Sequence, residues 1–186
     1  LHIAKGMMKE DKYFKEPDYE TKIRQSLKFL SKMASKGAIY RYYSTAEKRW
    51  VNKGSLSDHA YLAYAFMKAF SILNEPEYLQ LSKIVLKDAQ KLFYDKEQGI
   101  FIERVEDKSI DLEYQLELNG IIALTLLSML KDDRDEGQSA LIKNIITYFS
   151  NINALFEERL WDAEGWRFME RYVPYLKAAD IYLSLN

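Results

Sequence analysis

Helical segments of two kinds alternate along this chain, and the alternation limits the folds open to it. Residues 20–34, 77–93 and 138–149 repeat apolar side chains at i, i+3, i+4 and i+7, which predicts helices that bury one face. Residues 59–70 hold a single Lys and residues 120–130 hold no charge, so each predicts a helix surrounded by protein. The buried stripes are expected at Ile23, Leu27, Leu30 and Ala34, at Tyr78, Leu81, Val85, Ala89 and Leu92, and at Leu141, Ile142, Ile145 and Phe149. The alternation favours two concentric layers of antiparallel helical hairpins over a simple bundle, whose helices would all be similarly amphipathic.

A repeat of about 60 residues supports hairpins as the building unit. Residues 16–19 (EPDY) and 75–78 (EPEY) each open an amphipathic helix, where Pro suits the first turn and acids suit the helix N-terminus. Short strand-like pieces containing Gly are expected at 37–42 and 99–104, with a third, looser copy at 165–170. The fold class predicted is therefore all-α, part of an (α/α) toroid with short strand-like loops.

The C-terminal segment and one turn complete the predicted organisation. Pro174 is expected near the start of another apolar helix, and residues 95–99 (DKEQG), which lack the acid spacing of a calcium loop, predict a turn. At 186 residues the chain is predicted to form one domain, 1–186. Because it begins at Leu1 with what looks like the end of a helix, we expect it to be a piece of a longer protein.

Charge and composition disfavour several classes of function. The net charge of −1 provides no global field for nucleic acid or an anionic membrane surface, and no apolar run approaches a membrane span. There is no Cys, which excludes disulfides and thiolate metal sites within these residues, and two His leave no His-rich metal site. We expect no metal, no cofactor, no nucleic-acid partner and no membrane partner, and a cytoplasmic location.

The first candidate catalytic residues are Asp58 and His59, which open the first fully apolar helix. In a toroid, the N-termini of the inner helices converge on a central funnel, where an Asp–His pair suits acid–base chemistry or sugar hydroxyls. The alternative is that Ser55-x-x-Asp58 is a capping pattern and His59 a hydrogen-bonded core residue.

Glu113, Glu117 and Asn119 precede the second apolar helix in the same way. Glu113 and Glu117 are four residues apart, so they share a helix face and suit a pair of catalytic carboxylates for glycoside chemistry. Asn119 is a candidate ligand-binding residue. The alternative is that the acids complement the helix dipole and that Asn119 caps.

The strand-like pieces supply the other candidate ligand-binding residues: Arg41, Tyr42, Trp166, Arg167 and Glu170. Aromatic residues make up 14% of the chain, and a cleft lined with Tyr and Trp suits sugar rings, with Arg and Glu as hydrogen-bonding partners. The alternative is that the aromatic side chains fill the core and that the charges pair between helix ends.

Several stretches carry a family resemblance: EPDYETKIRQSLKFL with GAIYRYY, GSLSDHAYLAYAF, NEPEYLQLSKIVLKDAQKLFYDKEQGIF and ELNGIIAL. They resemble the C-terminal helical region of thioredoxin-domain-containing proteins of the spermatogenesis-associated protein 20 type. That region is similar to the toroids of six-hairpin glycosidases and N-acylglucosamine 2-epimerases. The chain departs from the family at His59, where Tyr is usual, at Glu117-Leu118 in place of Ser-Gly, and in lacking the thioredoxin-like domain.

The resemblance implies a toroid of about six hairpins, of which this chain supplies about three as the C-terminal half. It also implies a sugar-like small-molecule ligand in the funnel, with enzymatic activity left open. The alternative is a non-enzymatic scaffold or substrate-recruiting domain of a thioredoxin-like multidomain protein. A half toroid would expose the flanks of its inner helices, so a homodimer is also expected.

Overall fold

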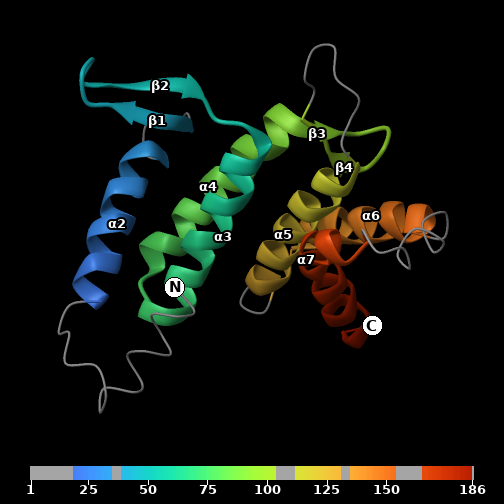
Figure 1. Cartoon of the computed structure of the whole chain (residues 1–186). Helices are drawn as coiled ribbons and strands as arrows, with labels where there is room; N and C mark the ends of the chain where they lie inside the picture. Colours follow the sequence, from blue (N-terminus) through green and yellow to red (C-terminus); the bar gives the residue numbers. More distant parts are fainter. Residues whose placement is uncertain (1–18, 35–38, 104–111, 131–134, 154–164, 186) are drawn as a thin grey trace.

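The computed structural model describes residues 19–34, 39–103, 112–130, 135–153 and 165–185, with side chains described for all of these except 19, 112, 113, 153 and 165–171. Within these ranges helices predominate, as predicted, and two small antiparallel sheets accompany them (Figure 1). The elements are α2 (Tyr19–Ala34), β1 (Tyr40–Ser44), β2 (Arg49–Lys53), α3 (Leu56–Leu73), α4 (Pro76–Phe93), β3 (Tyr94–Asp95), β4 (Ile100–Phe101), α5 (Leu112–Leu130), α6 (Glu136–Asn153) and α7 (Gly165–Ser184).

The three amphipathic helices α2, α4 and α6 turn their predicted stripes toward the core, with Ile23, Leu30 and Leu141 partly buried and the other members except Leu92 buried. Leu27 of α2, Val85 of α4 and Ile145 of α6 are each at most 2% exposed. The prediction is wrong for Leu92, which is exposed in the last turn of α4. Phe93 turns inward there instead, with its ring 5.2 Å from the ring of His59, so the core at this end of α4 is filled without Leu92.

The apolar helix α5 is the most enclosed element, because it packs against α3, α6 and α7. Every side chain from 115 to 127 is buried except Glu117, which is half-buried. The predicted enclosure of α3 is only partly correct, since Tyr61 on this helix is 48% exposed. The exposed side of α3 faces the cleft described below.

Gly120 sets the distance between α5 and α7. A Cβ atom at this position would lie 2.4 Å from the backbone nitrogen of Tyr175 and 2.9 Å from the carbonyl carbon of Pro174. Real Cβ atoms do not approach backbone so closely, so only glycine allows the two helices to cross here. Pro174 has no N–H to lose at this contact, which suits it to the crossing point.

Two β-hairpins lie at one end of the molecule, each leading toward the start of an apolar helix (Figure 1). β1 and β4 fall in two of the predicted strand-like pieces, and the structure adds their unpredicted partners β2 and β3. The turn predicted at residues 95–99 is confirmed: Asp95 Oδ1 accepts the N–H groups of Glu97 and Gln98, and Gly99 adopts a φ of 75°.

The third strand-like copy, predicted at 165–170, is wrong. These residues form the first turns of α7, which begins at Gly165 and contains Pro174 in its interior instead of near its start. Residues 166–170 hold no Gly or Pro after Gly165, so nothing in them stops a helix, and α7 gains a long contact with α5.

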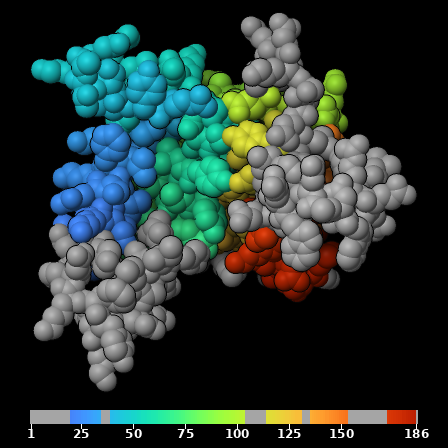
Figure 2. Space-filling model, in the orientation of Figure 1, coloured from blue at the N-terminus to red at the C-terminus, as the bar shows by residue number. Residues whose placement is uncertain are grey.

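The helix α2 stands at the edge of the molecule and is tied to α4 by an arginine. Arg24 makes ion pairs with Glu20 of its own helix, at 2.7 Å, and with Glu75, the N-cap of α4. These contacts, first Glu75 and then Glu20, raise the pKa of Arg24 above its ordinary value. In the space-filling view α2 (blue) and the β1–β2 hairpin (cyan) stand together against α3 (green) (Figure 2).

Candidate functional site

An aromatic cleft of about 750 Å³ opens where α2, the β1–β2 hairpin, α3 and the start of α5 meet. Its volume is within the range of small-molecule sites. Six of its lining residues are aromatic: Phe29, Tyr42, Tyr43, Trp50, Tyr61 and Tyr114. The remaining lining residues are Leu30, Met33, Arg41, Thr45, Ser57, Asp58, Leu62 and Ala65. The cleft therefore combines an aromatic wall with a small set of polar groups.

Trp50 of β2 is the centre of the aromatic wall. Its ring lies 5.3 Å from that of Phe29 and 5.1 Å from that of Tyr43, centroid to centroid. Tyr40 stacks on it at 6.4 Å. Phe29, Tyr42 and Tyr61, which all line the cleft, expose about half of their surface (48%, 49% and 48%). These rings present open faces to a ligand.

Asp58 lines the cleft and also caps α3. Ser55 and Asp58 form the predicted capping box: Ser55 N–H donates to Asp58 Oδ2 at 2.8 Å, and Asp58 N–H donates to Ser55 Oγ at 3.3 Å. Arg41 of β1 places its Nε 3.6 Å from the same Oδ2. The ion pair joins the hairpin to the start of α3, with both partners lining the cleft.

Glu117 stands behind the cleft. The Tyr61 hydroxyl, which belongs to a lining residue of α3, donates a hydrogen bond to Glu117 Oε1 on α5. Glu113 lies one turn earlier on the same helix, and its side chain is outside the described part of the chain. The structure thus brings Arg41, Tyr42, Asp58 and, through Tyr61, Glu117 to one place.

His59 does not reach the cleft. It is 1% exposed, its Nδ1 lies 2.7 Å from the carbonyl oxygen of Ser55, and its Nε2 lies 3.0 Å from Asp88 Oδ2. A carbonyl oxygen only accepts, so Nδ1 carries a proton. His59 therefore joins α3 to α4 as a buried, hydrogen-bonded residue, and this position matches the core alternative.

Asn119 is fully buried and holds β4 against α5. Its Oδ1 accepts the Phe101 N–H at 2.9 Å, and its Nδ2 donates to the carbonyl oxygens of Phe101 and Gln115, both at 2.8 Å. It is not among the residues that line the cleft. Trp166, Arg167 and Glu170 lie in the first turns of α7, with side chains outside the described set, so their place relative to the cleft stays a prediction.

Sequence reasoning missed the residues that form most of the aromatic wall: Phe29, Tyr43, Trp50, Tyr61 and Tyr114. A signal for part of the set was present, because Tyr40, Tyr42, Tyr43 and Trp50 lie within eleven consecutive residues, 40–50. Phe29 and Tyr61 stand out as aromatic residues on an exposed helix face only once it is known which face of each helix is buried. Their role comes from the packing of α2 beside α3.

Comparisons of the chain with protein-family models, with curated proteins and with solved structures gave no match. Among the residues that the structure describes, no helix is long and apolar enough to cross a membrane. Within the same residues, no three His, Asp or Glu side chains gather as ligands for a metal ion. Function must therefore be argued from the cleft itself.

Proposed function

We propose that this chain is a ligand-binding helical domain whose aromatic cleft takes a sugar-like molecule. The observation that carries the proposal is the cleft of about 750 Å³, with six aromatic rings on its wall and the Arg41–Asp58 pair at its edge. Aromatic faces pack on the apolar faces of sugar rings, while a few fixed polar groups select the hydroxyls.

The polar groups favour binding over chemistry as the primary function. Asp58 Oδ2 already accepts the Ser55 N–H and the Ser55 hydroxyl, both at 2.8 Å, and lies near Arg41. A carboxylate held this firmly serves as a fixed acceptor for ligand hydroxyls. If the domain also acts on its ligand, Asp58 in the cleft and Glu117 next to it are, among the residues whose side chains are described, the carboxylates placed for acid–base work.

We further propose that the helices form an arc of an (α/α) toroid, as the family resemblance implies. Three features support this: α3 and α5 are neighbours, both start at the hairpin end, and α5 is enclosed by α3, α6 and α7 (Figure 1). In this arrangement the cleft lies where the funnel is expected. A cytoplasmic location belongs to the same proposal.

Fluorescence of Trp50 tests the binding proposal directly. Phe replacements of Trp161 and Trp166 leave Trp50 as the one Trp of the chain. Calorimetry on the unmodified chain measures binding with Trp166, itself a candidate ligand-binding residue, in place. A saturable change on titration with oligosaccharides is expected. Release of reducing ends that depends on Asp58 and Glu117 would add catalysis to binding.

A matched pair of variants locates the site. Tyr61→Ala should weaken binding about 3- to 10-fold, the effect of one lost aromatic contact. Tyr148→Ala removes a tyrosine from α6, outside the cleft, and should leave affinity unchanged. If no oligosaccharide changes the Trp50 signal or the melting temperature, the binding proposal is wrong.

A second candidate function is supported by the outer face of α7. Val173, Leu176 and Leu183 expose 55%, 55% and 71% of their surface, with helical spacing between them. Such a face suits a scaffold domain that binds another protein, or a homodimer. Sedimentation equilibrium of the chain and of the Val173→Ser/Leu176→Ser variant tests the homodimer: a monomer at all concentrations would refute it.

A further inference from the structure

Positive charge is concentrated in the segment that forms one side of the cleft. Between residues 20 and 53 the sequence holds nine Lys and Arg against two Glu, although the whole chain has a net charge of −1. This segment comprises α2 and the β1–β2 hairpin. The charge balance of the whole chain hides a local excess that would act on any ligand of the cleft.

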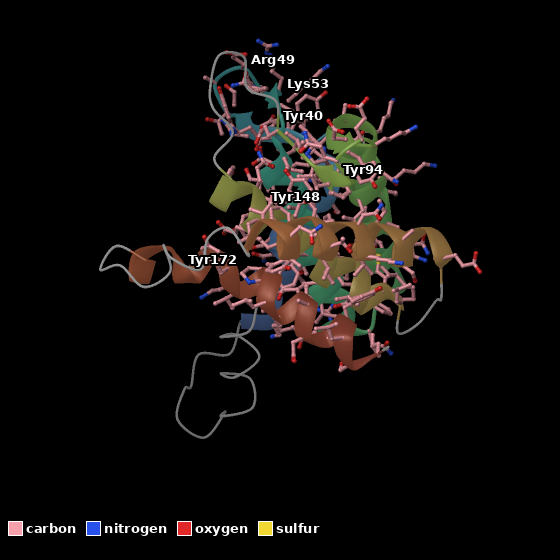
Figure 3. All side chains as sticks on the ribbon, turned by 90° about the vertical axis from the view of Figure 1, so that its right-hand side faces the viewer. Tyr40, Arg49, Lys53, Tyr94, Tyr148 and Tyr172 are labelled. Carbon is pink, nitrogen blue, oxygen red and sulfur yellow. The ribbon has the colours of Figure 1, made fainter. Side chains whose placement is uncertain are left out.

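The basic side chains belong to the two elements that form this side of the cleft. Arg41 lines the cleft, 3.6 Å from Asp58. Lys32 is on α2, and Arg49, which pairs with Glu47, is on β2. Lys53 pairs with Tyr40 across the hairpin. Arg49, Lys53 and Tyr40 lie together at the hairpin end of the molecule (Figure 3). We call Lys32, Arg41, Lys48, Arg49 and Lys53, all of them exposed, the basic rim.

The lining of the cleft also holds a carboxylate beside Arg41. This carboxylate is Asp58, and Glu117 accepts the hydroxyl of the lining residue Tyr61. Carboxylates select ligand groups that donate hydrogen bonds, as sugar hydroxyls do. They repel anionic groups, so the acidic groups of a ligand belong at the basic side chains and away from Asp58. An oligosaccharide offers hydroxyl donors on every ring, whereas a single-stranded nucleic acid, which also suits an aromatic wall with basic side chains, carries a negative charge at every linkage.

We propose that the ligand of the cleft is an acidic oligosaccharide, with sugar rings on the aromatic wall, hydroxyls toward Asp58 and uronic-acid carboxylates toward the basic rim. A neutral sugar would use the wall and the acceptors but would gain nothing from the positive charge of the rim. The inference rests on the proposed sugar-binding function and adds the charge of the ligand to it.

Hexasaccharides matched in linkage and differing only at C6 separate charge from shape. Cellohexaose and its C6-oxidised form, a β-1,4-linked hexaglucuronate, are such a pair, and the β-1,4-linked hexamers of mannan and mannuronan provide a second. We expect at least one acidic member to bind at least tenfold more tightly than its neutral partner at 50 mM salt. Raising the salt to 500 mM should remove most of that difference, because the rim charges are exposed and screened.

Rim variants test the cause of the preference. Lys48 has a φ of 50°, which Asn tolerates, so Lys48→Asn combined with Lys53→Gln removes two rim charges without strain. This variant should weaken the acidic ligand about fivefold at 50 mM salt and leave the neutral ligand unchanged. Lys91→Gln combined with Lys143→Gln removes two exposed charges from α4 and α6 and should change neither.

Each outcome decides one of the two proposals. Equal binding within every pair would keep the sugar-binding function and overturn the inference, as would a preference that the rim variant does not reduce. Binding by no hexasaccharide would overturn both. Hexathymidylate is included as the nucleic-acid probe: saturable binding of this probe with no saccharide binding would show that the cleft takes a nucleic acid, and both proposals would fall.

Discussion

Replacement of Asn119 by Ala should cost a large part of the stability of this domain. Asn119 is fully buried, and its side chain satisfies both the N–H and the carbonyl oxygen of Phe101, which is itself 1% exposed. Each buried backbone group left without a partner costs about 1–3 kcal/mol. The carbonyl oxygen of Gln115 also faces an N–H group within α5, so we assign no loss of stability to it. The expected loss is about 2–6 kcal/mol, against a typical total of about 5–15 kcal/mol.

Urea unfolding followed by circular dichroism measures this loss, with Asn151→Ala as the matched control. Asn151 is an exposed asparagine on α6, and its replacement should change stability by less than about 0.5 kcal/mol. Amide hydrogen exchange adds a local readout, because the Phe101 N–H should lose its protection in Asn119→Ala. A loss below about 1 kcal/mol, or abolished ligand binding with unchanged stability, would refute the structural role argued for Asn119.

Two further predictions concern α7. Gly120→Ala should destabilise the fold by about 1–3 kcal/mol or more, because its Cβ would meet the backbone of Tyr175. The control Gly137→Ala should have little effect, because its Cβ would meet only Asp135 Oδ1, at 3.1 Å. Equal melting temperatures for the two variants would contradict the close crossing of α5 and α7. Burial raises the pKa of Tyr175 above its ordinary value of 10.0. The neutral phenol therefore contributes its full share of the stability below about pH 10, and this share should be lost as the pH rises through the pKa of the folded state. Between pH 8 and 11, the free energy of unfolding measured in urea should therefore fall less steeply with pH for Tyr175→Phe than for the unmodified chain. Equal slopes would argue against a raised pKa of Tyr175.

Periodicity predicted the helices well because each helix follows a local rule. The stripe of α6, for example, is set by Leu141, Ile142, Ile145 and Phe149, and no information from elsewhere in the chain is needed to place it. The Pro predicted in the first turn after Glu75 is likewise confirmed at the start of α4. The first EPDY copy ends at Tyr19, where α2 begins, and its other residues lie outside the described ranges.

The misassigned segments depend on contacts that the local sequence does not contain. β2 pairs with β1 through a turn in which Lys48 adopts a φ of 50°, a conformation with no Gly or Asn to announce it. At residues 165–170 the Gly-plus-aromatic pattern matches that of the true strands. This segment is the start of α7, where the packing against α5 and the close crossing at Gly120 favour a helix over a strand.

The cleft was predictable in kind but not in membership. The aromatic content left both a cleft of Tyr and Trp and simple core packing open, and Arg41, Tyr42 and Asp58 were named from sequence as candidates. Phe29 could not be, because α2 presents it to Trp50 only after α2 docks beside the hairpin at a centroid distance of 5.3 Å. The same docking brings together positive charges that the net charge of the chain conceals.

Two candidate residues on one helix show why spacing alone could not divide core from site. Glu117 and Asn119 are two positions apart, and at 3.6 residues per turn their side chains point to nearly opposite sides of α5. The side that carries Glu117 meets Tyr61 of α3 next to the cleft, and the side that carries Asn119 meets β4 in the core. At Asp58 the two interpretations apply to the same residue, since one carboxylate caps α3 and lines the cleft. Only the neighbours on each side of a helix distinguish these cases, so the search for the site should begin at the face of α5 and α3 that carries Glu117 and Tyr61.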